Sequence, residues 1–262
     1  MSTVLSVHDL HHQYSSVHAL RGISFDLKQG ECVALIGPNG AGKSTCFACL
    51  AGQQTATSGQ VLWRKQNLMQ VPVTQRQALG IGRTFQVAQV FEALTVIQNL
   101  QLALKATTGV SALDALDDCE KETALAWAQA MGLDNLGASV LHASAAHLSY
   151  GNKKRLELAM AMAGLPHPSK ALLLLDEPAA GLSPDERFDM MARIRKLTAQ
   201  GTTVLYTEHN MDAVFGVADR VLVLMEGQLL AQGLPEEIAR HPEVRERYLG
   251  TSFAITHRGQ HA

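Results

Sequence analysis

Residues 32–45 read C-V-A-L-I-G-P-N-G-A-G-K-S-T, and this stretch decides the fold. Its first five residues, Cys32–Ile36, form a continuous apolar run, which is typical of a short strand buried on both faces of a parallel sheet. Residues 37–44 then fit the pattern G-x-x-x-x-G-K-[ST] between this strand and a following helical segment. Glycines let such a loop wrap tightly, so that its backbone N–H groups and the positive N-terminus of the helix bind phosphate oxygens. The stretch therefore predicts a site for the phosphates of a nucleotide.

The side chains of this loop have separate tasks in phosphate chemistry. We expect Lys43 to reach the β- and γ-phosphates and the Ser44 hydroxyl to ligate Mg²⁺, so ATP and Mg²⁺ are the predicted cofactors. A chance match is the alternative, and the strand before and helix after the loop argue against it. The predicted nucleotide-binding residues of the loop are Gly37, Pro38, Asn39, Gly40, Ala41, Gly42, Lys43, Ser44 and Thr45.

Strand and helix patterns alternate along the rest of the chain. Apolar runs at 171–175, 203–206 and 221–225 repeat the character of the first strand, and a helical pattern spans 185–200. This alternation predicts an α/β fold with a mostly parallel sheet and right-handed crossovers.

Other segments depart from this alternation. Residues 4–10 and 23–27 alternate between apolar and polar side chains, which predicts half-exposed strands. No buried strand pattern occurs between 87 and 148, where residues 120–131 are strongly helical. We therefore expect a helical insertion within the α/β core.

Two adjacent acids, Asp176 and Glu177, follow the apolar run at 171–175. An acid at the end of a strand is where a phosphate-loop enzyme holds Mg²⁺, so Asp176 is the predicted metal ligand. Glu177 stands one residue further, where a carboxylate can polarise an attacking water. The alternative is a charge pair at a helix N-terminus, which the presence of the phosphate loop makes the weaker interpretation.

A further motif suggests what the nucleotide is used for. Residues 148–155 read L-S-Y-G-N-K-K-R, which resembles the L-S-G-G-Q signature of the ATP-binding-cassette (ABC) ATPases. The remaining pieces occur in the order of that family, with Gln86 in R-T-F-Q before the helical insertion and His209 in Y-T-E-H-N-M after the acids. The resemblance extends over about residues 4–250.

The resemblance implies a P-loop NTPase (RecA-like) core with a β subdomain and an inserted α-helical subdomain. It predicts one ABC ATPase domain over residues 1–255, followed by a disordered tail at 256–262. Within that domain the core is expected at 1–86 and 156–255, and the helical subdomain at about 87–155.

The family also implies roles for particular residues. Glu177, His209 and Gln86 are the implied catalytic residues, and Ser44, Gln86 and Asp176 the implied Mg²⁺ site. Tyr14 resembles the aromatic residue that stacks on adenine, with ordinary packing as the alternative. Taken alone, Gln86 would be interpreted as a surface residue and His209 as a hydrogen-bonded histidine at a strand end. Their positions in the ordered series of motifs favour the catalytic roles instead.

The signature predicts a helix N-terminus that binds an anion. Ser149 precedes a strongly helical run, so we expect it to be the N-cap, with Tyr150 and Gly151 in the first turn. In the family this terminus contacts the γ-phosphate held by a second subunit, so that ATP joins two copies. The implied contact residues are Ser149, Tyr150, Gly151 and Asn152.

Two positions depart from the usual family pattern. Asn152 replaces the signature glutamine and is one methylene shorter, and Ser183 stands where most members carry an aspartate. A serine hydrogen-bonds more weakly than a carboxylate across a dimer. The neighbouring histidines His11 and His12 point to opposite faces of a strand, so we interpret them as surface residues rather than metal ligands.

Four short stretches of the sequence resemble one subclass of the ABC ATPases. Residues 80–86 (G-I-G-R-T-F-Q), 91–100, 176–182 and 242–250 resemble the ATP-binding subunits of branched-chain amino acid importers, a group that also serves urea and short-chain amides. The implied partners are a second ABC ATPase subunit, the same or different, two transmembrane permease subunits and, indirectly, a periplasmic solute-binding protein. The implied location is peripheral, on the cytoplasmic face of the inner membrane.

Apolar side chains after Gln86 are candidates for a groove that receives a permease helix. The alternative is that they pack within the chain. The four residues are Val87, Val90, Phe91 and Leu94.

Composition excludes several competing classes. The 262 residues are 47% hydrophobic and 18% charged, which argues against disorder, and no apolar run approaches the ~18 residues of a membrane span. A net charge of −2 argues against an ABC ATPase of DNA repair or translation, so no nucleic-acid partner is expected.

Two alternatives depend on motifs rather than on composition. A P-loop kinase needs neither the signature nor His209, which argues against that class. Within transport, a lipid or lipopolysaccharide exporter is the runner-up. Cys46 and Cys49 lack a second pair for zinc and are interpreted as buried thiols.

Overall fold

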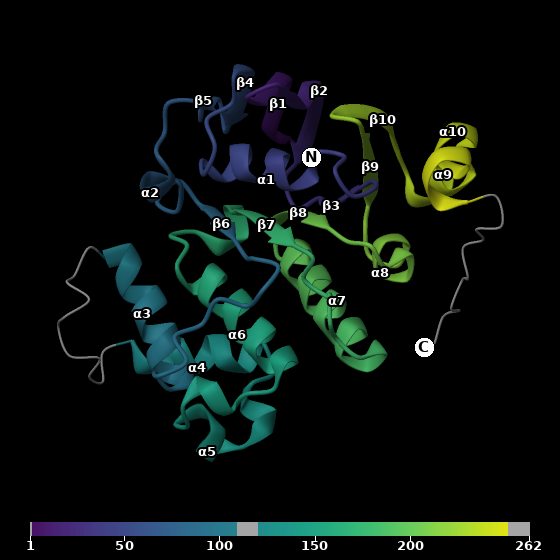
Figure 1. Ribbon diagram of the computed structural model, residues 1–262. Helices are drawn as coiled ribbons and strands as arrows, with labels where there is room; N and C mark the ends of the chain where they lie inside the picture. The colour runs from purple at the N-terminus through teal and green to yellow at the C-terminus, as the bar shows by residue number, and fades with distance from the viewer. Residues whose placement is uncertain (1, 109–119, 251–262) are drawn as a thin grey trace.

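Two sheets surrounded by helices make up the described residues, 2–108 and 120–250, of this computed structural model (Figure 1). The larger sheet has the order β10-β9-β3-β8-β7-β6, in which every neighbouring pair is parallel except β10 with β9. The smaller sheet is antiparallel, with the order β2-β1-β4-β5. The strands are β1 Thr3–Tyr14, β2 Val17–Lys28, β3 Cys32–Ile36, β4 Ser58–Trp63, β5 Gln66–Asn67, β6 Ile81–Arg83, β7 Leu172–Asp176, β8 Thr203–Thr207, β9 Arg220–Met225 and β10 Gln228–Gly233. The tail predicted at 256–262 lies outside the described residues.

The helices fall into groups around the larger sheet. Helix α1 lies between the two sheets, and the helices from α3 to α6 lie in the lower left of the view in Figure 1. Among the described residues, no helix is both long and apolar enough to cross a membrane. The helices are α1 Lys43–Ala51, α2 Val73–Arg76, α3 Val96–Thr108, α4 Lys121–Ala130, α5 Ala138–Leu141, α6 Tyr150–Ala163, α7 Pro184–Ala199, α8 Met211–Phe215, α9 Pro235–Arg240 and α10 Pro242–Val244, with 3₁₀ turns at Asp134–Leu136, Ala145–His147 and Pro168–Lys170 and a π-helical turn at Arg245–Leu249.

Strand β3 shows why its sequence is apolar throughout. Cys32, Ala34 and Ile36 belong to the core that packs against helices α3 to α8, whereas Val33 and Leu35 belong to the core under the smaller sheet and α1. All five side chains are buried, as predicted from the continuous apolar run. The α/β class with a mostly parallel sheet is confirmed.

The described residues between β6 and β7 are rich in helix. It contains α3, α4, α5 and α6, and α4 confirms the helix predicted at 120–131. Helix α6 continues to Ala163, beyond the subdomain boundary expected near residue 155, and that boundary stays a prediction.

Strand β6 was not predicted from the sequence. It has three residues and contains Gly82, where a Cβ atom would lie 3.1 Å from Leu173 Cδ1 and 3.3 Å from the Ala161 carbonyl oxygen. A run this short, with a glycine required by close packing, carries no periodic signal.

The interpretation of His12 as a surface residue is wrong. The side chain is buried, its ring packs edge-on at 4.4 Å from the ring of Tyr14, and Nδ1 lies 3.1 Å from the Thr55 carbonyl oxygen. The physical reason is that the segment before β4 crosses this end of β1, where the Thr57 N–H donates to the His11 carbonyl oxygen. His11 stays partly exposed beside Asp9. The predicted buried thiols Cys46 and Cys49 are confirmed, and burial raises the pKa of Cys49 to about 11.

A buried glutamate joins α6 to the segment after β6. Oε1 of Glu157 accepts hydrogen bonds from the backbone N–H groups of Phe85 and Gln89, each at 3.1 Å. Oε2 is buried and has no hydrogen-bond partner among the described residues. Burial raises the pKa of Glu157 to about 7, against the opposing effects of these two hydrogen bonds and of Lys154.

This raised pKa predicts a pH-dependent stability. The folded state favours the protonated acid, so the contribution of Glu157 to the free energy of unfolding is full below the ordinary pKa of 4.5 and is lost as the pH rises through about 7. A Glu157→Gln variant keeps the carbonyl acceptor without the charge. The melting temperature of the variant minus that of wild type is therefore expected to be larger at pH 8 than at pH 5. The change is about 2–4 °C for each kcal/mol by which the wild type loses free energy of unfolding between the two pH values. Calorimetry at the two pH values measures this, with the exposed Glu122→Gln as control, and an equal difference at both pH values contradicts it.

Candidate functional site

The loop after β3 depends on glycines at two crowded positions. Gly37 and Gly42 have φ values of 149° and 104°. A Cβ atom on Gly42 would lie 2.5 Å from the Ala19 carbonyl oxygen, and one on Gly37 would clash with the Leu224 carbonyl oxygen. Helix α1 begins directly after Gly42, so the loop leads straight into a helix N-terminus, the kind of position that binds anions.

Lys43 is already held in the loop. Its Nζ atom donates to the carbonyl oxygens of Gly37 at 2.6 Å and Pro38 at 3.0 Å, and the side chain is buried. Burial lowers the pKa of Lys43, while the nearby carboxylates of Glu177 and Asp176 oppose the shift. An ammonium group has three donors, and two of them are used by the loop itself.

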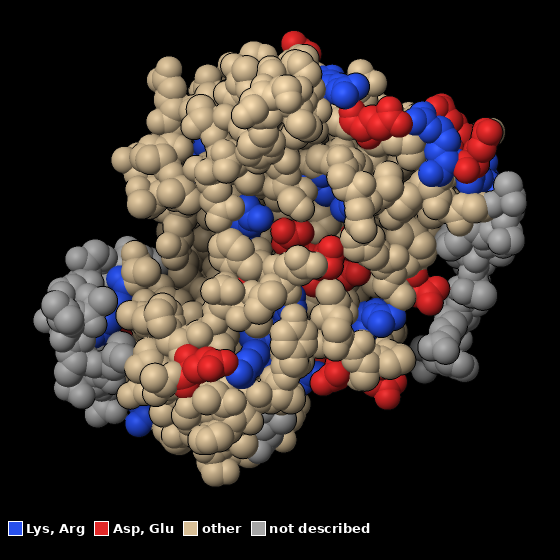
Figure 2. All heavy atoms as spheres, in the orientation of Figure 1, with Lys and Arg blue, Asp and Glu red and all other residues tan. Residues whose placement is uncertain are grey.

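A cavity of about 420 Å³ opens beside this loop. Charged side chains of both signs gather in the middle of the face shown in Figure 2, between the strand-rich part and the helical part of the molecule. The cavity is lined by Val17, His18, Ala19, Arg21, Asn39, Gly40, Ala41, Gly42, Lys43, Ser44, Thr45, Asp176, Glu177, His209 and Glu226. The structure thus brings the loop, both predicted acids and the predicted histidine to one place.

Glu177 lies at the centre of the three predicted catalytic residues. Its Oε2 atom accepts a hydrogen bond from Gln86 Nε2 at 3.1 Å, and its Oε1 atom lies 3.1 Å from His209 Nε2. Gln86 comes from the segment after β6, Glu177 follows β7, and His209 follows β8. Three segments far apart in the sequence therefore meet on one carboxylate. Gln86 does not line the cavity and reaches the site through Glu177.

The backbone of Glu177 is strained. Its φ of 47° lies in the left-handed region, which costs an L-residue about 1–2 kcal/mol. The Glu177 N–H donates to Thr207 Oγ1 at 3.0 Å, and its carbonyl oxygen accepts from Lys154 Nζ at 3.2 Å. Strained residues with such support are concentrated at functional sites.

Asp176 is oriented by two neighbours. Oδ1 accepts from the Thr207 hydroxyl at 2.7 Å, and Oδ2 forms an ion pair with Arg83 at 3.4 Å. Asp176 lines the same cavity as Ser44. A hydroxyl and a carboxylate are the oxygen ligands that Mg²⁺ accepts alongside phosphates and waters, so this donor set fits the ion.

The signature segment begins α6 as predicted. Ser149 is the N-cap, and its Oγ accepts from the Asn152 N–H at 3.3 Å. Gly151 packs against the start of α7, since a Cβ atom there would lie 2.6 Å from Glu186 Oε1. The Tyr150 hydroxyl donates to the Gln86 carbonyl oxygen at 3.1 Å.

The two departures from the family pattern have local partners. Oδ1 of Asn152 accepts from Arg155 Nη1 at 3.3 Å. Ser183 caps α7 in a capping box with Glu186. Both residues therefore have structural roles within this chain.

Tyr14 ends β1, and its side chain does not line the cavity. Val17 and His18, just beyond the following turn, do line it. Its stacking role stays a prediction.

The sequence did not reveal the buried residues whose side chains bind the backbone of the catalytic segments. Buried Glu208 accepts from the N–H groups of Ala179 at 2.8 Å and His209 at 3.2 Å, and thereby ties the segment after Glu177 to the predicted histidine. Lys154 and Glu157 act on the segment that contains Gln86. The available signal was the position of two charged residues on the otherwise buried face of α6.

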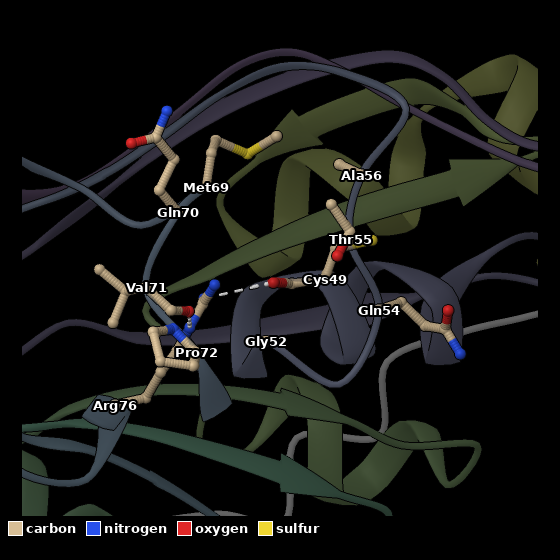
Figure 3. A pocket seen from close by; sticks show the side chains of 10 residues that line it. All are labelled: Cys49, Gly52, Gln54, Thr55, Ala56, Met69, Gln70, Val71, Pro72 and Arg76. Carbon is tan, nitrogen blue, oxygen red and sulfur yellow. Dashed lines mark hydrogen bonds between the residues drawn. The ribbon is translucent and has the colours of Figure 1, made fainter. Parts of the chain in front are cut away.

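A second cavity, of about 170 Å³, lies at the C-terminal end of α1 (Figure 3). Arg76 borders it and donates to the carbonyl oxygens of Leu68 at 2.6 Å, Val71 at 3.2 Å and Cys49 at 3.3 Å, and to that of Leu50. A cation that satisfies carbonyls at a helix C-terminus stabilises the helix. None of the predicted site residues lines this cavity.

Family comparison agrees with the geometry. The family model described as ABC transporter matches residues 20–180, and the one described as Branched-chain amino acid ATP-binding cassette transporter matches residues 228–254. The chain is 38% identical over 259 residues to the high-affinity branched-chain amino acid transport ATP-binding protein LivG of Escherichia coli K12, covering 94% of this chain and 98% of LivG. It is 34% identical over 257 residues to BraF of Pseudomonas aeruginosa, a protein of the same description, with the same coverage.

Solved structures extend the likeness to three dimensions. The ADP conformation of MJ1267, an ATP-binding cassette of an ABC transporter, has a TM-score of 0.83 and 27% identity, covering 95% of this chain and all of that one. A nucleotide-free cassette from an ABC transporter has a TM-score of 0.82 at the same identity and coverage. The sequence match, the shared fold and the assembled site lead to one conclusion: the chain belongs to the ABC transporter family of ATP-binding cassettes.

Proposed function

We propose that this chain is the ATP-hydrolysing subunit of an importer for branched-chain amino acids or a related small solute. The observation that carries the proposal is the contact of Gln86 and His209 with the two oxygens of Glu177 beside the phosphate loop. The similarity to LivG and BraF, which are branched-chain amino acid transport proteins, and the match at residues 228–254 support the import of branched-chain amino acids over the exporter alternative.

ATP binding is assigned to the phosphate loop. Backbone N–H groups of the loop and of the start of α1 are proposed to bind the phosphates, and the third donor of Lys43 remains for a phosphate oxygen. Ser44, Asp176 and Gln86 are the residues that would hold Mg²⁺, and the ion when bound neutralises charge on the phosphates.

Hydrolysis is assigned to Glu177 and its two neighbours. Its carboxylate orients the attacking water and accepts a proton from it. The amide of Gln86 and the imidazole of His209 contact this carboxylate beside the cavity, and we propose that His209 donates to the γ-phosphate as charge develops there.

Assembly is assigned to the start of α6. Ser149 to Asn152 are proposed to contact ATP bound to a second ABC ATPase subunit, so that ATP joins two subunits under two permease subunits on the cytoplasmic face of the membrane. A periplasmic solute-binding protein would deliver the solute, which this chain does not itself contact.

A permease contact is proposed for the exposed segment after Gln86. Val87 and Phe91 are 64% and 53% exposed, whereas Val90 packs against the core. Buried Asn99 fixes Phe91 by accepting from its N–H at 2.8 Å and donating to its carbonyl oxygen at 3.0 Å. An exposed aromatic side chain on a fixed backbone suits the docking of an apolar helix.

Replacing Lys43 tests nucleotide binding. Lys43→Ala removes a charge-assisted phosphate contact of about 1.5–3 kcal/mol, so the Kd for ATP is expected to rise about 10- to 150-fold. Titration calorimetry with ATP measures the change, and the exposed Lys196→Ala is the control. Equal affinities in the two variants contradict the assignment.

Replacing Glu177 separates binding from hydrolysis. Glu177→Gln keeps the shape and removes the proton acceptor, so kcat is expected to fall about 10²- to 10⁴-fold with little change in the Kd for ATP. A dimer is expected to accumulate with ATP and is detected by size-exclusion chromatography. The exposed Glu236→Gln serves as the control, and hydrolysis at the wild-type rate in Glu177→Gln assigns the role elsewhere.

Replacing Phe91 tests the permease contact. Phe91→Asp puts a charge on the proposed apolar contact, so co-purification with the permease and uptake of labelled leucine are both expected to fall, while ATP binding stays normal. Phe188→Asp on α7 is the matched control, since Phe188 is 79% exposed. Normal assembly and uptake in Phe91→Asp place the contact on another surface.

A further inference from the structure

Lys154 is a buried ammonium group at the meeting point of two catalytic segments. Its side chain is 3% exposed. Nζ donates to the carbonyl oxygens of Gln86 at 2.7 Å, Phe85 at 3.2 Å and Glu177 at 3.2 Å. All three donors of the ammonium group are therefore directed at the backbone of the residues that carry the proposed hydrolysis.

The position of Lys154 on α6 explains how it reaches both segments. Tyr150, Lys154 and Glu157 are spaced four and three residues apart, so they share one face of the helix. Glu157 binds the N–H groups on either side of Gln86, at Phe85 and Gln89, while Lys154 and Tyr150 bind the Gln86 carbonyl oxygen. The peptide of Gln86 is thus fixed by one face of one rigid helix.

The backbone of Glu177 is the second group that Lys154 supports. Its left-handed backbone is costly, and the Lys154 contact restrains the carbonyl oxygen of this strained residue. The hydrogen bond from Gln86 Nε2 to Glu177 Oε2 spans 91 positions in the sequence, and Lys154 bridges the backbones of both partners.

We propose that Lys154 is a positioning residue for ATP hydrolysis, whose ammonium group fixes the backbone of Gln86 against that of Glu177 and so holds the amide of Gln86 on the catalytic carboxylate. The inference rests on the proposed ATPase activity. Lys154 does not itself line the cavity and reaches it only through the backbone of Glu177, so it acts on kcat and leaves the KM for ATP nearly unchanged.

The kinetic test compares neighbouring lysines in the full-length chain. Lys154→Met is expected to lower kcat about 10- to 100-fold, because small displacements of catalytic groups are costly. Lys153→Met is the matched control, since Lys153 lies on the same helix and pairs on the surface with Glu92. Rates are normalised to the number of ATP molecules bound per chain, so that misfolded protein does not contribute. Equal kcat values in the two variants overturn the proposal.

A double-variant cycle distinguishes positioning from general destabilisation. In a Gln86→Ala background, the effect of Lys154→Met on kcat is expected to be at least about threefold smaller than in wild type, since the side-chain amide that Lys154 positions is absent. An undiminished effect overturns the proposal. If Lys154→Met folds poorly, Lys154→Gln, which retains two N–H donors, takes its place. Its effect on kcat is likewise expected to be at least about threefold smaller in the Gln86→Ala background than in wild type.

Amide hydrogen exchange gives a readout that does not need hydrolysis. Peptides that cover residues 85–89 and 177–180 are expected to exchange at least about threefold faster in Lys154→Met or Lys154→Gln than in Lys153→Met. Unchanged exchange in both Lys154 variants overturns the proposed link whatever the activity. Faster exchange in a chain whose wild type hydrolyses no ATP retains the link and contradicts the proposed ATPase function instead.

Discussion

Parallel pairing of three buried strands is the constraint on which the site depends. Strand β8 pairs with β3 on one side and with β7 on the other, and Asp176 lies in register with Thr207. Since parallel strands all end at the same edge of a sheet, the segments that follow them must come together there. The phosphate loop, the two acids and His209 are adjacent for this reason, although they stand far apart in the sequence. The apolar character of the strands, buried on both faces, is thus what assembles the polar site.

The segments that leave this edge need partners for their backbone groups. A loop lacks the regular hydrogen bonds of a sheet or helix, and a backbone group that loses water without gaining a partner is costly. In this chain buried charged side chains supply the partners: Glu157 and Lys154 for the segment around Gln86, and Glu208 for the segments around Ala179 and His209. Charged groups give stronger hydrogen bonds than neutral ones, which suits segments that must hold catalytic side chains in place.

The sequence was informative where chemistry and periodicity coincide. Strand β3 and its loop were predictable because a fully apolar strand, tight glycines and a lysine each leave a distinct pattern, and the position of Asp176 followed from the strand before it. Strand β6 is too short to show a period, and the burial of His12 depends on a segment that crosses it from elsewhere in the chain. Lys154 was missed for a related reason, since a lysine within a helix ordinarily indicates a solvent-exposed position. Its burial arises only from the packing of α6 against two distant loops.

The hydrogen bonds of Lys43 have a consequence for the entropy of binding. A free lysine side chain loses about 1.5–2 kcal/mol of rotational freedom when it is fixed in one conformation. Here the carbonyl oxygens of Gly37 and Pro38 already fix it, so this loss belongs to folding rather than to the encounter with nucleotide. The free energy gained from the phosphate contact is then available for affinity and for work on the rest of the assembly.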